Sequence, residues 1–317
     1  MRAVISAAAF AAVASGACGD NLAPPSIQWR DGPALPGGRL EPGVIAAGDA
    51  LWVIGGFDDG IDVVASAWVL PAASSAWQDA PAAPEALTHM NLASVDGAIL
   101  LLGGLRGRDY SPTGASWALD AGASTWRRLA AMPAGQERGA AAVIVDGGRV
   151  VVAGGADLRA AVASVWAYDV AGDRWSRLPD LPSPRSHAVG AVAADGALLV
   201  VGGTATLDAS QPLADVLALA PGASAWTARA PMPTARGGCA AAVIDGGLIC
   251  AGGEAGGSAL RTAERYDLVD DAWTELEPMP RARAGTGGAA IAGALWVPGG
   301  AHRLRFEPSR AVEIWMP

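Results

Sequence analysis

Five arginines occupy the same place in a unit that recurs along the chain, and their chemistry is that of anion recognition. Each lies three residues after the proline of its unit, one of them after a two-residue insertion: Arg39, Arg138, Arg185, Arg236 and Arg283. A guanidinium group binds a carboxylate or sulfate through two parallel hydrogen bonds. We predict that these side chains form a basic collar that binds a ligand at one channel mouth. The structural alternative is that each one bonds backbone carbonyls or a neighbouring carboxylate.

Two residues beyond the arginine position, three units carry side chains that can exchange protons: Glu41, His89 and His187. Side chains alternate along a strand, so we expect both positions on the same strand face. Glu41 and His89 belong to consecutive units and are candidates to face each other. A carboxylate raises the pKa of an adjacent histidine and the pair can transfer protons. A weak metal site and exposed side chains without chemistry are the alternatives; we predict no metal and no cofactor.

The elements that must position these residues are repeats. Six Trp-x₆-Pro units begin at Trp29, Trp77, Trp126, Trp175, Trp226 and Trp273. A Gly-Gly pair stands in phase with them at 55/56, 103/104, 154/155, 202/203, 252/253 and 299/300. A period near ~50 residues with four short strands per unit is typical of β-propeller blades. The sequence therefore predicts an all-β, six-bladed propeller.

The fifth unit shows the strand plan most clearly. An apolar strand before Asp245-Gly246 is followed by a second one, Leu248–Ala251, that ends at Gly252-Gly253. Asp-Gly adopts the positive φ angles of a tight hairpin turn. The second strand is apolar without interruption, which indicates burial on both faces between neighbouring blades. The glycine pair removes two side chains and permits φ angles that other residues avoid.

The two chain ends share one blade in this plan. Trp29 is a fourth-strand tryptophan with no unit in front of it, and the chain finishes on a third strand, residues 312–315. We therefore predict that the strand around Trp29 completes the last blade and leaves no open sheet edge. Pro298 removes a backbone donor from a second strand, so a bulge is expected there.

A double glycine follows an apolar strand, and then come Tyr168 or Tyr266 and a tryptophan. In this pattern residues 26–317 resemble the Kelch family. The resemblance implies a propeller, and family members often act as binding modules. Some bacterial six-bladed Kelch proteins interconvert sialic-acid anomers, which would use Arg185 or Arg236 with Glu41, His89 and His187. Galactose oxidases of this type hold copper with two tyrosines, two histidines and a cysteine, a set that this chain supplies poorly.

The N-terminus is predicted to be a separate targeting segment. Residues 1–17 join one arginine to a short apolar run and small residues, as in a secretory signal peptide. Cys18 after Gly-Ala resembles a bacterial lipobox, although Ser15 stands where that pattern usually has leucine. We expect lipidation at Cys18, a tether over 18–25, and an exported periplasmic or cell-surface lipoprotein. A secreted soluble protein is the alternative.

Charge and cysteine content narrow the partners. The formal net charge of −9 excludes a non-specific nucleic-acid binder. Cys239 and Cys250 lie on adjacent strands, where a disulfide and two buried thiols are both compatible with the sequence.

Because no catalytic motif occurs, we predict a non-catalytic, monomeric binding module of the bacterial envelope. Its ligand would be a protein or an anionic carbohydrate. The alternatives are a sialic-acid mutarotase-like or epimerase-like isomerase and, less favoured, a copper-radical oxidase.

Overall fold

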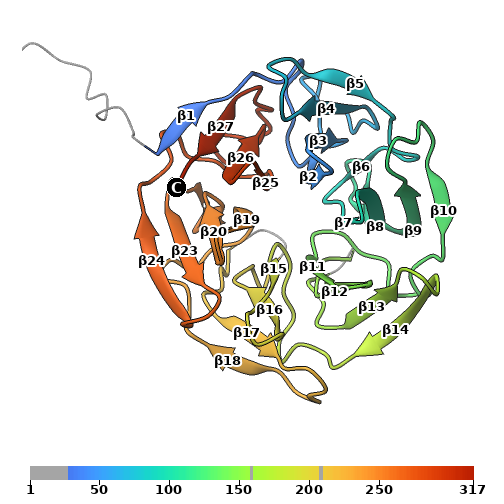
Figure 1. The fold of residues 1–317 in the computed structure, drawn as a ribbon, viewed down its shortest axis with the longest axis vertical. Coiled ribbons are helices and arrows are strands. Elements are labelled where there is room, and N and C mark those ends of the chain that lie inside the picture. The colour runs from blue at the N-terminus through green and yellow to red at the C-terminus, as the bar shows by residue number, and fades with distance from the viewer. Residues whose placement is uncertain (1–27, 158–159, 207–209) are drawn as a thin grey trace, which may run out of the picture.

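The computed structural model of the protein describes residues 28–157, 160–206 and 210–317. Over these residues it contains strands and turns but no helix, and six sheets stand around a central channel (Figure 1). The predicted all-β, six-bladed propeller is confirmed. The predicted signal peptide, Cys18 and the tether lie outside the described residues. Among the described residues, no helix has the length and apolar character to cross a membrane.

The strands of a blade follow one another from the channel to the rim. Blade 1 contains β2 (Gly43–Ala47), β3 (Ala50–Ile54), β4 (Ala67–Pro71) and β5 (Gln78–Ala80). Blade 2 contains β6 (Leu87–Thr88), β7 (Leu92–Val95), β8 (Ala98–Arg106), β9 (Ser111–Leu119) and β10 (Arg127–Leu129). Blade 3 contains β11 (Ala142–Asp146), β12 (Arg149–Ala153), β13 (Val165–Asp169) and β14 (Arg174–Leu178).

The second half of the ring repeats this plan. Blade 4 contains β15 (Val189–Val192), β16 (Leu198–Val201), β17 (Val216–Leu219) and β18 (Thr227–Arg229). Blade 5 contains β19 (Ala240–Ile244), β20 (Gly247–Ala251), β23 (Ala263–Asp267) and β24 (Ala272–Leu276), with a small hairpin of β21 (Glu254–Ala255) and β22 (Ser258–Ala259). Blade 6 contains β25 (Ala289–Ile291), β26 (Ala294–Pro298), β27 (Val312–Trp315) and β1 (Trp29–Asp31).

The hydrophobic core lies between blades. All five residues of β20 are buried, as its uninterrupted apolar sequence predicts. One apolar cluster joins Leu199 and Val201 of blade 4 to Leu248 and Cys250 of blade 5. The turn that precedes β20 takes positive φ at both residues, 45° at Asp245 and 73° at Gly246. The sequence pattern thus predicts both the turn and the two-sided burial.

The glycine pairs form the joint between consecutive blades. The N–H of Gly253 donates to the carbonyl of Arg283 in the next blade at 2.8 Å. A Cβ on Gly252 would lie 2.4 Å from that same carbonyl oxygen, and both glycines have positive φ. The corresponding bond recurs in four other blades, from Gly56 to Leu87, Gly155 to Arg185, Gly203 to Arg236 and Gly300 to Arg39. Glycine is therefore required by conformation and by close approach together.

The tryptophans of the repeat connect blades at the rim. Each indole N–H donates to a backbone carbonyl of the preceding blade or of its exit segment, as Trp175 does to Ala130 at 2.9 Å and Trp273 to Ala230 at 2.9 Å. The other four do so with Trp29 to Glu277, Trp77 to Pro33, Trp126 to Pro81 and Trp226 to Pro179. These bonds place the repeat tryptophans between consecutive blades.

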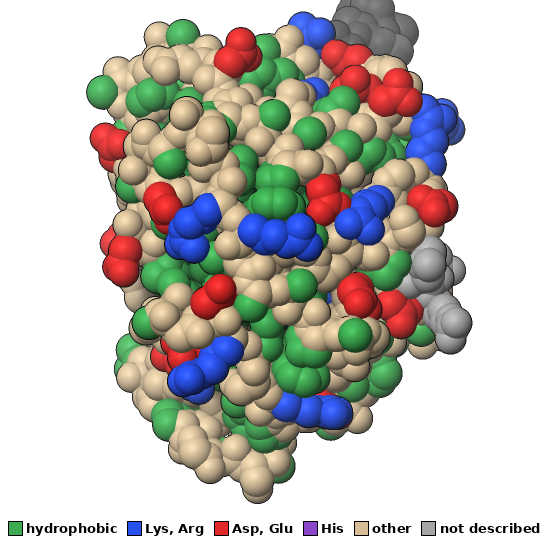
Figure 2. Space-filling model, turned by 90° about the vertical axis from the view of Figure 1, so that its right-hand side faces the viewer, with side chains coloured by type: hydrophobic (Ala, Val, Ile, Leu, Met, Phe, Trp, Pro, Cys, Tyr) green, Lys and Arg blue, Asp and Glu red, His purple; other side chains and the backbone are tan. Residues whose placement is uncertain are grey.

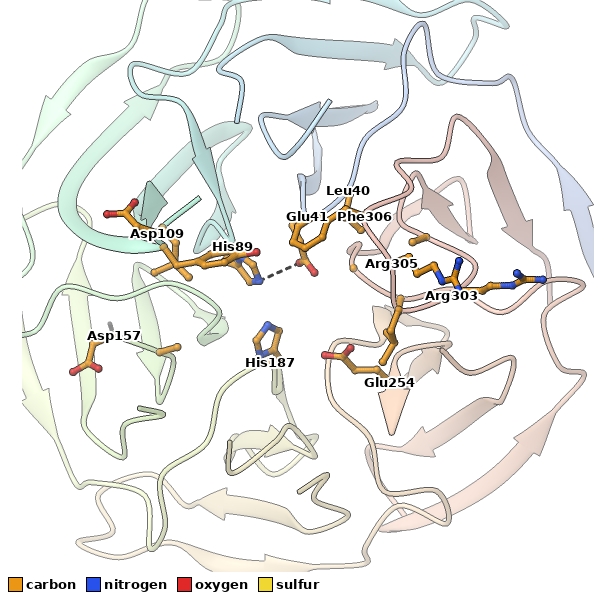
Figure 3. A pocket seen from close by; sticks show the side chains of 17 residues that line it. Leu40, Glu41, His89, Asp109, Asp157, His187, Glu254, Arg303, Arg305 and Phe306 are labelled. Carbon is orange, nitrogen blue, oxygen red and sulfur yellow. Dashed lines mark ion pairs between the residues drawn. The ribbon is translucent and has the colours of Figure 1, made fainter. Parts of the chain in front are cut away.

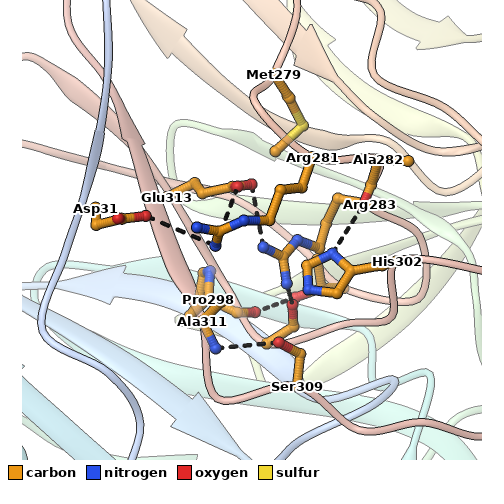
Figure 4. A network of polar contacts seen from close by, with 12 residues as sticks. Asp31, Met279, Arg281, Ala282, Arg283, Pro298, His302, Ser309, Ala311 and Glu313 are labelled. Carbon is orange, nitrogen blue, oxygen red and sulfur yellow. Dashed lines mark hydrogen bonds and ion pairs between the residues drawn. The ribbon is translucent and has the colours of Figure 1, made fainter. Parts of the chain in front are cut away.

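The ring closes through the two ends of the described chain. Strand β1 pairs antiparallel with β27, with Trp29 opposite Trp315, so the predicted closure is confirmed. Below this seam, Arg283 forms a buried ion pair with Glu313 at 3.1 Å, and Arg281 lies 3.7 Å from Asp31 (Figure 4). Because β1 pairs with β27, the sheet of blade 6 has four strands like most of the other blades.

Two sequence expectations are settled at the ends of strands. The expected bulge at Pro298 is wrong: Pro298 is the last residue of β26 and pairs in register with Val312. A register shift lies instead between Leu102 and Gly104 in blade 2. Cys239 and Cys250 form a disulfide with their Cα atoms 5.6 Å apart, a separation that ordinary disulfides have.

We predict that Gly252→Ala destabilises the protein by about 3 kcal/mol or more, because it adds a clash with the Arg283 carbonyl to the cost of positive φ. Gly256→Ala in the same blade is the control. Its φ is 55° and a Cβ there meets nothing within 4 Å, so we expect a loss of about 1–2 kcal/mol. Urea unfolding of the two variants measures the difference. Equal losses would show that the joint does not require glycine.

Candidate functional site

Six equivalent residues form a ring around the channel, two positions after the arginine position of each blade. All have positive φ between 49° and 64°: Glu41, His89, Ala140, His187, Gly238 and Gly285. Backbone bonds link neighbours in this inner ring. His187 N–H donates to Ala140 O at 2.7 Å, and Gly238 N–H donates to His187 O at 2.8 Å. Because the backbone is fixed this way, the side chains of Glu41, His89 and His187 point toward the channel axis (Figure 3).

A second set of six residues stands above this inner ring, directly after the glycine pairs. Each forms a short backbone bridge with the residue that follows the arginine position in its own blade: Phe57, Leu105, Ala156, Thr204, Glu254 and Ala301. Glu254, for example, bridges Gly237. Four of these six residues line the same central cavity as the inner ring. Glu254 is the one acid in the set, and it adds a carboxylate from blade 5.

The central cavity has a volume of about 640 Å³. Its walls are largely apolar, with Leu40, Leu105, Ala156 and Ala301 among them. Glu41, His89, His187 and Glu254 form the floor, because they also line a narrower cavity of about 120 Å³ that continues from it. The loop after Ala301 completes the rim with Arg303, Leu304, Arg305 and Phe306. We call this cavity the central pocket.

The floor is a contact network of titratable groups. His89 Nε2 lies 3.3 Å from Glu41 Oε2, and the two side chains are 9% and 26% exposed. His89 Nδ1 shares a hydrogen bond with Thr88 Oγ1 at 2.9 Å. The rings of His89 and His187 meet edge to face with centroids 5.1 Å apart. The predicted facing of Glu41 and His89 is confirmed by this geometry.

Burial controls the ionisation of the floor. It lowers the pKa of His89 to about 4. It also lowers the pKa of His187 to about 4, with a smaller contribution from His89. Burial raises the pKa of Glu41, against the opposing effect of His187. Burial and the charge of Glu41 together raise the pKa of Glu254 to about 7. The expected rise of a histidine pKa beside a carboxylate is therefore wrong here, because desolvation of the imidazole outweighs the attraction.

The five arginines do not form a basic collar in the central pocket. Their exposed fractions are 4% or less and none of them lines the pocket. Their polar partners are backbone carbonyls, hydroxyl groups, a glutamine or carboxylates within their own blades. The nearest are Ser66 for Arg39, Gln136 for Arg138, Asp215 for Arg185, Glu264 for Arg236 and the Gly299 carbonyl for Arg283. The structural alternative accounts for all five.

The strand alternation assumed in the sequence analysis fails at this point for a physical reason. Each arginine and its inner-ring residue were expected on one face because they are two residues apart. The inner-ring residue has positive φ, which ends the strand alternation between them. The arginine therefore points into its blade while Glu41, His89 or His187 points into the channel.

Sequence reasoning missed Glu254 and Tyr110 in the central pocket. Burial raises the pKa of Tyr110, with a further contribution from Glu41, and its ring meets His89 edge to face at 5.6 Å. The signal for Glu254 is its place directly after a glycine pair, a position that lines the pocket in four of the six blades. Tyr110 lies in the turn between β8 and β9, which extend past the glycine pair of blade 2.

The residues do not fit a copper-radical site. The hydroxyl groups of Tyr168 and Tyr266 donate to Asp173 at 2.5 Å and to Asp271 at 2.6 Å, near the rim. Cys239 and Cys250 are joined to each other. Within the described ranges, no three His, Cys, Asp or Glu residues are grouped as metal ligands.

We predict that His187→Ala reduces the loss of stability in acid. The folded pKa of about 4 lies below the ordinary 6.5, so this histidine's stabilising contribution is complete above pH 6.5 and is lost as pH falls toward 4. The full effect is about 3 kcal/mol at most. Ala140 shows that alanine fits this backbone position. In wild type and in His187→Ala alike, the raised pKa of Glu254 has the opposite effect, because it lowers stability as pH rises toward 7.

Urea unfolding at pH 7.5, 6.0 and 4.5 measures this difference, with the exposed His302→Ala as control. Identical pH profiles for wild type and His187→Ala would contradict the assignment of a buried neutral His187.

Comparison with known proteins agrees with the repeat. The Kelch motif matches residues 137–182 and 235–280, which belong to blades 3 and 5. The Kelch-like protein terF of Aspergillus terreus (strain NIH 2624 / FGSC A1156) is 34% identical over 124 residues. That match spans 37% of this chain and 27% of the length of the fungal protein. Two matched motifs in a six-bladed ring therefore support a Kelch-repeat family for this chain.

Proposed function

We propose that the protein is a non-catalytic binding module that uses the face around the central pocket. A Kelch propeller is consistent with a protein-binding module. The observation that carries the proposal is the pocket of about 640 Å³, open at a rim where Leu304 and Phe306 are 39% and 56% exposed. Exposed apolar side chains around a preformed cavity are typical of a binding surface. The ligand in this proposal is a segment of a partner protein.

The outer side of the ring offers less to a partner. Figure 2 shows arginine and acidic side chains interspersed over one such side. Arg127 pairs with Asp120 at 2.9 Å and Arg177 with Asp180 at 2.7 Å, and more than 40% of each of these side chains is exposed. Exposed pairs of this kind contribute little to stability or recognition. Each blade ends at the rim on a strand of only three to five residues, and such short edges support a monomer.

An anionic carbohydrate is the weaker ligand proposal. The five arginines predicted to bind its carboxylate are buried and bonded within their own blades, and the described cations that line the pocket are Arg303 and Arg305 at the rim. The isomerase alternative needs both an arginine for the carboxylate and an acid–base pair. Glu41 and His89 supply the pair at 3.3 Å, but Arg185 and Arg236 bind Asp215 and Glu264 instead. Binding without catalysis fits these positions better.

We predict that Phe306→Asp weakens partner binding at least about tenfold, since it puts a charge on the apolar rim. Val269→Asp is the control, because Val269 is 71% exposed in the turn between β23 and β24. Wild type and the two variants, each immobilised separately, would be used to recover partners from an extract of the native host. Quantitative mass spectrometry would then compare them. A partner that binds all three proteins equally would place its site away from the pocket and contradict the proposal.

The proposed setting is the bacterial envelope, with the ring held at a membrane by lipid on Cys18. Acyl chains contribute roughly 0.8 kcal/mol per buried CH₂, so more than one chain gives firm attachment.

We predict that Cys18→Ser moves the protein from the membrane fraction to the soluble fraction and abolishes incorporation of labelled palmitate. Cys239→Ser combined with Cys250→Ser serves as the control for loss of cysteine elsewhere. Membrane attachment that survives Cys18→Ser would contradict the lipid anchor.

A further inference from the structure

We propose that the floor of the central pocket recognises a single primary ammonium group on an apolar stem, such as the side chain of a lysine in a partner segment. The inference deepens the proposed function and rests on the same pocket. It assigns Glu254 and Glu41 as the residues that bind the cation. Three observations support it: the convergence of two carboxyl groups, the lack of a paired arginine among the described residues, and the apolar walls above.

The two carboxyl groups come from opposite directions. Glu41 belongs to the inner ring at blade 1 and Glu254 follows the glycine pair of blade 5. Figure 3 shows both side chains directed to the channel axis, where His89 and His187 also point. Burial raises the pKa of Glu254 and the charge of Glu41 raises it further, so the two carboxyl groups are close enough to interact. A group seated between them would contact both carboxyl groups.

No arginine in the part of the chain that the structure describes is paired with either carboxyl group. Across residues 28–157, 160–206 and 210–317, the Glu254 carboxyl group makes no hydrogen bond or ion pair with another side chain, and Glu41 has His89 as its partner. The pocket-lining cations, Arg303 and Arg305, are exposed at the rim, and their guanidinium groups point away from the channel axis (Figure 3). A bound ammonium group would supply the missing charge.

Burial makes the site responsive to such a charge. It keeps part of the Glu254 population protonated near neutral pH, because its pKa is about 7. A cation bound between the carboxyl groups favours their ionised forms. The attraction between cation and carboxylate is stronger in a poorly solvated site. Binding should therefore release protons near pH 7. Neutral His89 and His187 offer ring nitrogens that do not repel the cation.

The walls select the rest of the ligand. Above the floor, the pocket is lined by Leu40, Leu105, Ala156, Ala284 and Ala301. A chain of methylene groups buries apolar surface there while its charged end reaches the floor, as a lysine side chain does elsewhere. A free inorganic cation gains nothing from such walls. The absence of a three-ligand group among the described residues also disfavours it.

The pH dependence has a definite sign. The other titratable groups on the floor are Glu41, His89, His187 and Tyr110, and the rim adds Asp109, Asp157, Arg303 and Arg305. An ammonium group stays charged up to about pH 10. Affinity should thus rise from pH 5.5 to 8.5 as Glu254 ionises, by about tenfold or more.

The test uses n-butylammonium as the lysine side-chain mimic and n-butanol as its uncharged counterpart, measured by calorimetry at pH 5.5, 7.0 and 8.5. We expect millimolar binding of n-butylammonium at pH 8.5, proton release at pH 7.0, and binding of n-butanol at least about tenfold weaker. Nα-acetyl-lysine amide distinguishes a peptide source from a free amine. Tighter binding of the amide supports a lysine side chain, and tighter binding of n-butylammonium overturns that source.

Glu254→Gln keeps the shape and removes the charge, so we expect at least a tenfold loss of affinity. Glu275→Gln is the matched control, because it changes net charge equally on the exposed face of β24 in the same blade. Glu41→Gln is the second variant if the first fails to fold. Equal affinity for n-butylammonium and n-butanol, or an unchanged affinity in both pocket variants, would overturn the proposal.

Failure here is distinguishable from failure of the binding-module proposal. A partner lost on Phe306→Asp but retained on Glu254→Gln, with no ammonium binding, would leave the module standing and overturn the cation site. Ammonium binding without any rim-dependent partner would support the cation site and contradict the protein-binding role.

Discussion

One backbone hydrogen bond, found at five of the six joints of the ring, sets the position of one blade relative to the next. In blade 5 it runs from the N–H of Gly253 to the carbonyl of Arg283, at 2.8 Å. The guanidinium of Arg283 turns back into its own blade, where it donates to Gly299 O at 2.7 Å and pairs with Glu313. One residue therefore links two blades through its backbone and stabilises its own blade through its side chain. A buried charge is tolerated because it is paired and hydrogen bonded.

The joint explains why the channel tolerates such different side chains. Backbone hydrogen bonds hold most of the inner ring in place, so the fold does not depend on which side chain stands at each position. Ala140, Gly238 and Gly285 leave half of this ring with no more than a methyl group, while Glu41, His89 and His187 fill the rest. Burying the latter groups costs stability, as their shifted pKa values record. Groups that the fold does not need are the natural place for function.

The sequence predicts the architecture well because the repeat states each structural requirement six times. The glycine pairs, the apolar second strands and the rim tryptophans each reflect a local contact, and all are found as expected. The site is predicted less well, because single residues at the ends of strands decide it. The arginines were expected beside Glu41 and His187 because two-residue spacing preserves a strand face. Positive φ at the inner ring breaks that rule. The residue types at these positions do not predict the positive φ, because they include glutamate, histidine and alanine as well as glycine.

Blade 2 shows that the joint itself matters more than the residues that usually make it. It has Leu87 at the arginine position, and its Gly103 has positive φ and lies in the register shift between Leu102 and Gly104. Asn91 takes over there: its side-chain N–H group donates to Arg138 O at 3.0 Å and its side-chain oxygen accepts from Ala141 N–H at 3.0 Å.

Because strands β8 and β9 of this blade run on past the joint, their turn carries Tyr110 over the pocket. The blade that departs from the repeat thus gives an otherwise regular channel mouth one aromatic side. Phe306 and Tyr110 both line the pocket and both contact the ring of Phe57, so the aromatic side chains gather on one side and make the pocket asymmetric.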